Sequence, residues 1–244
     1  MSADQFKQLA AYNKWANARL YAAALDLSEQ SYRLHIGVFF GGLHGTLNHL
    51  LLADRLWLKR LTGEGDHPNR LDAILYEDRV ELARARIAED ERLITVVEKY
   101  DEAALRDLHS YKTSTGMPQS QVLGDILLHL FNHQTHYRGE ACACLSILTG
   151  DEPPSLDLLV FRRGGTAPDL EKLTSRWPLS GSIRSQQLAY ALISIAVDEQ
   201  TLGECSWISI AGRSKEGRCR PRLADLQRSA NVLQQNPTPC ERRV

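Results

Sequence analysis

The chain has no long run of apolar residues, although 43% of its 244 residues are hydrophobic. No stretch approaches the roughly 20 consecutive apolar residues that a membrane-spanning helix needs, so we expect no membrane association. The sequence also lacks a Gly-rich phosphate-binding loop, a Gly-x-Ser-x-Gly motif and a Cys-x-x-Cys pair. These absences argue against the common nucleotide-binding, serine-hydrolase and zinc-ribbon or redox motifs.

Cysteine is scarce and is not arranged for disulfide bonding. The five cysteines are Cys142, Cys144, Cys205, Cys219 and Cys240, an odd number. Cys142 and Cys144 are two residues apart on a predicted helix, so their side chains point in different directions. The first residues show no basic region followed by an apolar core, and we expect no secretory signal. Reduced thiols and a cytoplasmic location are therefore predicted.

Net charge is also small, because the formal value is −1 at neutral pH. Residues 1–161 carry more acidic than basic side chains, and residues 162–244 carry more basic ones. A nucleic-acid-binding domain normally concentrates positive charge on one face. The acidic first part therefore argues against nucleic acid as a partner, and the basic charge of the second part is too dilute to argue for it.

Four segments have apolar residues at the three- and four-residue spacing of a helix. They span residues 3–27, 42–61, 76–100 and 120–148. Residues 110–118, rich in Ser, Thr, Gly and Pro, are predicted to form a loop or a short extended excursion. Helices of this number and length favour an all-α fold, a four-helix bundle.

The composition changes after Phe161. Residues 162–168 resemble a linker, and beyond them only residues 186–197 have the pattern of a short helix. We expect residues 1–161 to be the folded bundle and residues 162–244 to be a C-terminal extension that is partly disordered. A chain ended near Arg163 should accordingly keep its helical fold and its melting temperature.

Histidines gather on one predicted helix. His129, His133 and His136 lie within eight residues, at spacings of four and three that place side chains on one face of a helix. His49 lies on a second apolar helix. Imidazoles that converge from two helices commonly hold a transition metal, so these residues are candidate ligands.

Residues 3–161 resemble the DinB family, which is named for DNA-damage-inducible proteins. The resemblance is carried by residues 12–17, 45–57, 129–140 and 154–159. It implies a four-helix bundle, commonly a homodimer. It also implies a divalent-metal site with one histidine from the second long helix and two histidines, four residues apart, from the fourth.

Residue by residue, the resemblance assigns His49 and His133 as ligands of Zn²⁺ or Ni²⁺. The third ligand would fall at position 137, where this chain has Tyr137, and a phenol with an unperturbed pKa of about 10 is the poorer ligand at neutral pH. We predict that His136, one position earlier, completes the metal site. His129 and Tyr137 are the alternatives for this third position.

Two functions are compatible with this pattern. The resemblance implies a metal-dependent thiol S-transferase or hydrolase, in which the metal would activate a bound small thiol or a water. The alternative is a non-catalytic stress-response or interaction bundle whose metal site is degenerate.

Two other polar residues have both structural and functional interpretations. Asp54 is expected to be a buried hydrogen-bond acceptor that could orient a histidine. Arg138 is expected to form a structural salt bridge, with recognition of an anionic substrate as the alternative.

Overall fold

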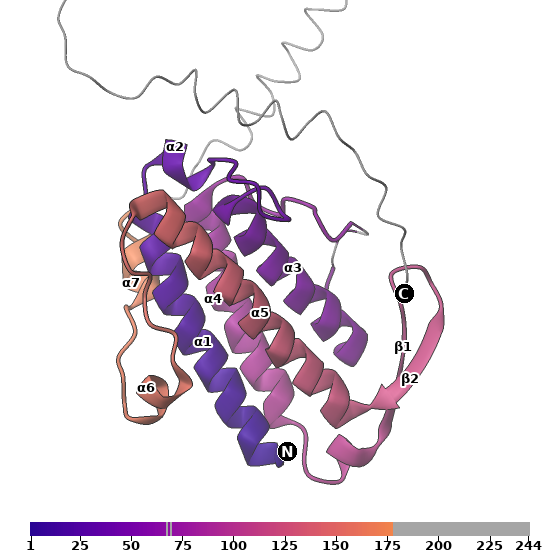
Figure 1. The fold of residues 1–244 in the computed structure, drawn as a ribbon. Coiled ribbons are helices and arrows are strands. Elements are labelled where there is room, and N and C mark those ends of the chain that lie inside the picture. The colour runs from indigo at the N-terminus through magenta and orange to yellow at the C-terminus, as the bar shows by residue number, and fades with distance from the viewer. Residues whose placement is uncertain (67, 69, 178–244) are drawn as a thin grey trace, which may run out of the picture. The chain divides into compact units, whose positions relative to one another are not determined.

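The computed structural model describes residues 1–66, 68 and 70–177 of the chain (Figure 1). Four long helices dominate it: α1 (Ala3–Leu25), α3 (Leu43–Thr62), α4 (Arg79–Glu98) and α5 (Leu123–Thr149). They pack side by side as a bundle. The predicted all-α fold is therefore confirmed, and the four long helices are the four segments expected from the sequence.

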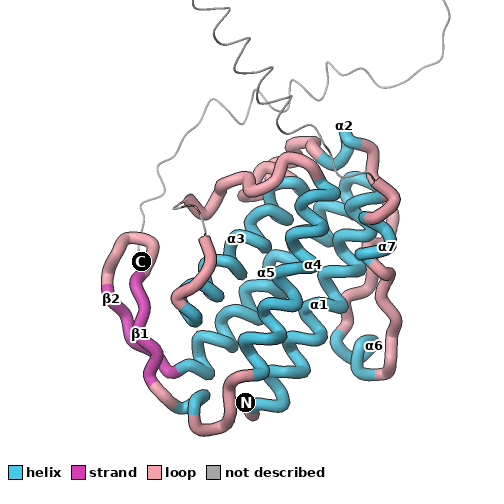
Figure 2. The backbone as a smooth tube through the Cα atoms, turned by 180° about the vertical axis from the view of Figure 1, so that it is seen from behind, coloured by secondary structure: helices cyan, strands magenta, loops and turns pink. Residues whose placement is uncertain are grey.

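Shorter elements connect and flank the bundle. The helices are α2 (Glu29–Tyr32), the 3₁₀ turn η1 (Ala104–Arg106), α6 (Leu158–Arg162) and α7 (Leu170–Thr174). Strands β1 (Leu108–Lys112) and β2 (Pro118–Val122) pair antiparallel, so the predicted extended excursion is a hairpin. Figure 2 shows this hairpin outside the bundle on the side of α3. Within the described ranges, no helix is long and apolar enough to cross a membrane.

Local sequence explains where the helices begin and end. Ser2 and Gln5 form a capping box at the start of α1, and the Asp78 carboxylate accepts two backbone N–H bonds at the start of α4. Helices α3 and α5 end at Gly63 and Gly150, whose φ angles are 77° and 76°. Residues with a side chain rarely adopt this left-handed conformation, so glycine stops both helices.

The apolar stripes of the four helices meet in a shared interior. Helix α1 packs against α4 and α5, and α3 packs against the same two helices. Fully buried leucines from α1, α3 and α4 fill the contact, and they include Leu20, Leu47, Leu50, Leu51 and Leu82. Burial of each such side chain stabilises the fold by about 1.5–3 kcal/mol relative to exposure.

The interior also contains a buried ionic network. Arg86 of α4 lies 2.7 Å from Asp54 of α3 and 3.0 Å from Asp90 on its own helix. Gln134 donates to Asp54 at 2.6 Å. Asp54 is thus a buried acceptor, as expected, and its partners are Arg86 and Gln134. Among the described residues, no histidine donates a hydrogen bond to it.

Arg138 belongs to the same interior. Its guanidinium donates to Asn13 of α1, and only 2% of the residue is exposed. Asn13 in turn donates to Asp90 at 3.2 Å. Arg138 is therefore a structural residue that joins α5 to α1, but among the described residues its hydrogen-bond partner there is an amide and not the carboxylate of the expected salt bridge.

Residues after the predicted boundary at 161 also pack on the bundle. Trp15 donates its indole N–H to the carbonyl of Gly165 at 2.7 Å, and Leu170 of α7 is 6% exposed. Helix α7 contacts α4 and α1. The division into domains 1–161 and 162–244 stays a prediction, and the helix expected at residues 186–197 lies outside the described residues.

Candidate metal centre

The structure brings His49 of α3 and His133 of α5 together. Helices α3 and α5 pack along each other, and both imidazoles project into the space between them. Their Nε2 atoms are 3.3 Å apart. Two predicted ligands that are 84 positions apart in the sequence are therefore neighbours in the fold.

The orientation of His49 is fixed by contacts on both sides of its ring. Its Nδ1 lies 2.8 Å from the backbone carbonyl of Leu71, which can only accept a hydrogen bond. Nδ1 therefore carries the proton, and the lone pair of Nε2 faces His133. The ring of Phe40 stacks on His49 with centroids 3.9 Å apart and an interplanar angle of 20°. The imidazole is thus held in one tautomer and one rotamer.

Burial keeps both imidazoles neutral. It lowers the pKa of His133 to about 4, with a further contribution from the neighbouring His49, His129 and His136. Burial also lowers the pKa of His49. Neutral imidazole is the form that binds metals, so both rings are in the ligand state at neutral pH.

The separation of the two nitrogens suits a shared cation. Two nitrogen ligands at 2.0–2.1 Å from a tetrahedral Zn²⁺ are about 3.4 Å apart. The observed 3.3 Å is close to this value. Without a metal the two nitrogens can form a hydrogen bond to each other, in which the N–H of His133 Nε2 donates to His49 Nε2. The pair therefore fits two positions of a metal site.

Tyr137 occupies the place beside the pair where a third imidazole would complete the set. Its ring centroid lies 4.4 Å from that of His49 and 4.6 Å from that of His133. Burial raises the pKa of the Tyr137 phenol, and the nearby Glu140 carboxylate raises it further. The phenolate that would bind a metal is thus disfavoured.

The other two histidines of α5 lie at the edge of this arrangement. His136 is exposed, and its ring contacts that of Tyr137 at 4.7 Å. His129 is also exposed and lies 6.0 Å from His133 by ring centroids. No three His, Cys, Asp or Glu side chains of the described residues are grouped to hold a metal ion. A three-imidazole set is therefore absent there, and His136 as the third ligand stays a prediction.

Comparison with known proteins identifies the family of the chain. The family model described as the DinB family matches residues 1–170. The chain belongs to the DinB family. It is also 26% identical over 151 residues to Protein DinB of Bacillus subtilis (strain 168). This alignment covers 59% of the chain and 86% of that relative. The DinB match continues to residue 170 and so extends past residue 161, where the resemblance was expected to end.

Several contacts of the candidate centre were not identified from the sequence. Phe40, which stacks on His49, comes from the loop before α3, and Leu71 comes from the segment after it. The one sequence signal is Gly45, because a Cβ there would lie 2.0 Å from the carbonyl oxygen of Phe40. Only glycine lets the loop approach the helix so closely. The loop itself has no periodicity from which its contact with His49 could be predicted.

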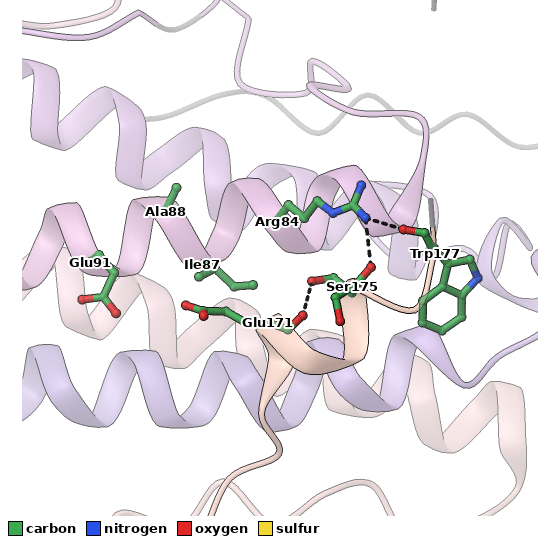
Figure 3. Close-up of a pocket in the computed structure, with 8 residues that line it drawn as sticks. Arg84, Ile87, Ala88, Glu91, Glu171, Ser175 and Trp177 are labelled. Atoms are coloured by element: carbon green, nitrogen blue, oxygen red, sulfur yellow. Dashed lines mark hydrogen bonds between the residues drawn. The ribbon is translucent and has the colours of Figure 1, made fainter. Parts of the chain in front are cut away.

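A separate hollow of about 690 Å³ lies between α4 and α7 (Figure 3). Its wall includes Arg84, Ile87, Glu91 and Glu171. Arg84 donates to the carbonyl of Trp177 at 2.7 Å and so fastens the segment after α7 to the bundle. The histidine pair lies between α3 and α5 instead, so this hollow is not part of the candidate metal centre.

Proposed function

We propose that this DinB-family protein binds a divalent metal ion, Zn²⁺ or Ni²⁺, through Nε2 of His49 and Nε2 of His133. The observation that carries the proposal is the 3.3 Å separation of two Nε2 atoms on neutral rings, with His49 held by the Leu71 carbonyl. Metal-ligating histidines usually donate their other ring N–H to such an acceptor, which fixes their orientation. The pair has this anchor on one of its two members.

We expect the proposed site to have low affinity for the metal and, with two imidazole ligands, not to be catalytic. Catalytic zinc sites usually have three protein ligands and one open position. Here Tyr137 replaces the third imidazole, and burial raises the pKa of its phenol. Two imidazoles hold a metal less firmly than three. This favours the second of the two sequence interpretations, a non-catalytic stress-response or interaction bundle with a degenerate metal site.

A metal-dependent thiol S-transferase or hydrolase is the second candidate function. Two protein ligands leave coordination positions for a small thiol or for water, and this is the feature that favours it. When bound, the metal would supply a Lewis acid that lowers the pKa of that thiol or water. In this candidate, Phe40 and the Leu71 carbonyl keep the His49 ring oriented, and Tyr137 borders the open positions.

The family membership carries further parts of the proposal. We propose a homodimer and expression in response to DNA damage, both by analogy with the family, and a cytoplasmic location because the sequence predicts reduced cysteines. Sedimentation of the full chain at micromolar concentration tests the dimer. A monomer under those conditions would contradict it.

Calorimetric titration of the full chain, produced without a histidine tag, tests the metal site. We expect calorimetry with ZnCl₂ or NiCl₂ to show binding that disappears in His49→Ala and in His133→Ala. The control is His35→Ala, since His35 is exposed in the loop before α3. Binding that is unchanged in both site variants would contradict the proposal.

Activity assays with a small thiol then separate the two candidate functions. Conjugation or hydrolysis that is lost on chelation of the metal, and lost in His133→Ala, would support the enzyme. Metal binding without any such activity would support the non-catalytic bundle.

A further inference from the structure

A second hollow, of about 370 Å³, lies where the end of α3 meets the β1–β2 hairpin. Its wall is basic and hydroxylic. The polar residues that line it are Lys59, Arg60, Tyr111, Lys112, Thr113 and Ser114. None of the described residues that line it carries a carboxylate, so this part of the wall has a positive charge that it does not itself neutralise.

Arg60 is the most firmly held of these cations. Its guanidinium lies over the rings of Trp57, at 4.6 Å, and Tyr111, at 5.2 Å. Its Nη2 contacts the Ser114 hydroxyl at 3.4 Å. His109 of β1 donates to the backbone carbonyl of Arg60 at 2.8 Å, which fastens the hairpin to the helix. The guanidinium is thus oriented before any ligand arrives.

Arg60 differs from other arginines of α3 and α4 in having no carboxylate partner among the described residues. Arg55 lies 3.5 Å from a Glu89 oxygen, and Arg92 lies 2.8 Å from the other. Burial without a counter-charge lowers the pKa of Arg60. A partly desolvated cation of this kind gains free energy when an anion binds beside it.

The two lysines add charge from different elements. Lys59 of α3 lies 3.8 Å from Asp66, whose side chain is 98% exposed, so this contact is loose. Lys112, at the end of β1, is exposed and forms no ion pair with any described residue. Neither amine is therefore committed to a buried partner.

Stabilisation of the α3 C-terminus accounts for only part of this arrangement. Lys59 and Arg60 lie in the last turn of α3, where cations favourably oppose the helix dipole. That effect does not require Lys112, Thr113 or Ser114, which the hairpin brings to the same hollow. Two elements thus bring polar side chains to a cation that has no carboxylate partner among the described residues.

We propose that this hollow binds an oxyanion, a phosphate or carboxylate group of a small molecule. The Arg60 guanidinium, held by Trp57 and Tyr111, offers a planar pair of N–H donors that match two oxygens. Lys59 and Lys112 supply further positive charge. The hydroxyls of Thr113 and Ser114 can donate to the remaining oxygens. This site is independent of the histidine pair and of any metal.

Calorimetry and thermal unfolding of the full chain test the site with inorganic phosphate and with citrate as probes. Ionic strength is held constant with KCl, because surface electrostatics respond to salt alone. We expect saturable binding and a rise in melting temperature with at least one probe. Loss of one charge-assisted contact costs about 1.5–3 kcal/mol, so Arg60→Gln and Lys112→Gln should each weaken binding about tenfold or more.

Lys99→Gln is the matched control, since it removes one exposed positive charge at the end of α4 that is not among the residues lining the hollow. Binding of phosphate alone or of citrate alone identifies which oxyanion the site takes. Arg60→Gln also removes packing against two rings, so the exposed Lys112→Gln decides the outcome. Unchanged affinity in Lys112→Gln, equal loss in Lys99→Gln, or no saturable binding of either probe would overturn the proposal.

Discussion

Oδ2 of Asp54 and Nη1 of Arg86 lie 2.7 Å apart in the centre of the bundle, where the two side chains are 1% and 0% exposed. They join α3 to α4. Asp90 and Arg138 complete the network, so two carboxylates and two guanidinium groups balance one another away from water. Such a network is sensitive to the loss of a single member, because the remaining charges stay buried without compensation.

Replacement of Arg86 should therefore be strongly destabilising. We expect Arg86→Ala to lower the free energy of unfolding by about 3–5 kcal/mol, because Asp54 and Asp90 lose their shared cation. Urea denaturation followed by circular dichroism measures the change. The control is Lys14→Ala, which breaks an exposed ion pair with Glu91 between α1 and α4 and should cost less than about 1 kcal/mol. Equal effects of the two variants would contradict a structural role for the network.

Tyr137→His should strengthen metal binding. The substitution would place a neutral imidazole beside both members of the pair, since the Tyr137 ring already lies within 5 Å of each. We expect the affinity for Zn²⁺ or Ni²⁺ to rise about ten- to hundredfold. Loss of a residue that only hydrogen-bonds a metal ligand has an effect of this size, so the figure is cautious for a direct ligand. Calorimetry on tag-free protein measures it.

Two companion variants locate the third ligand. His49→Ala in the Tyr137→His background should abolish the gain, because the site then returns to two imidazoles. His136→Ala in the natural background should leave binding unchanged if His49 and His133 act alone. If instead His136→Ala removes the metal and Tyr137→His adds nothing, His136 is the third ligand.

Stability should fall on acidification because of the histidine pair. The folded state holds the pKa of His133 at about 4, below the ordinary value of 6.5. As pH falls, the His133 imidazole is therefore protonated in the unfolded chain before it is protonated in the folded one. The stability that the neutral His133 imidazole contributes is present above pH 6.5 and is lost as pH falls toward 4. We expect a loss on the order of 2 kcal/mol across this window, after allowance for partial exposure.

Thermal unfolding at several pH values measures this loss. His133→Gln, which does not titrate, should flatten the dependence between pH 6.5 and 4. His35→Gln, in an exposed loop, is the control. A profile that is identical in His133→Gln and in the natural protein would contradict the assignment.

Truncation tests whether the folded unit ends near residue 161, as the sequence predicts, or includes the residues after it that pack on the bundle. The sequence predicts no loss when the chain ends near Arg163, whereas the structure places Leu170 and the Gly165 carbonyl against the bundle. We expect a chain ending at residue 163 to be less stable than one ending at residue 177, by about 2–4 kcal/mol. Equal melting temperatures for the two chains would restore the earlier boundary.

The sequence by itself determined the four long helices and two members of the candidate centre. Helix periodicity, the Ser2 and Asp78 caps and the Gly63 and Gly150 stops are local signals, because each acts within a few residues. The spacing of the histidines and their resemblance to the DinB family then identified His49 and His133.

Tertiary structure alone decided what surrounds these residues. The stacking of Phe40 on His49, the Leu71 carbonyl at its Nδ1 and the partnership of Asp54 with Arg86 join segments that are not periodic or that are far apart in the sequence. The same holds for the hairpin residues that meet Arg60. Such contacts depend on how whole helices and loops pack, and a pattern within one segment contains no information about the surface that will face it.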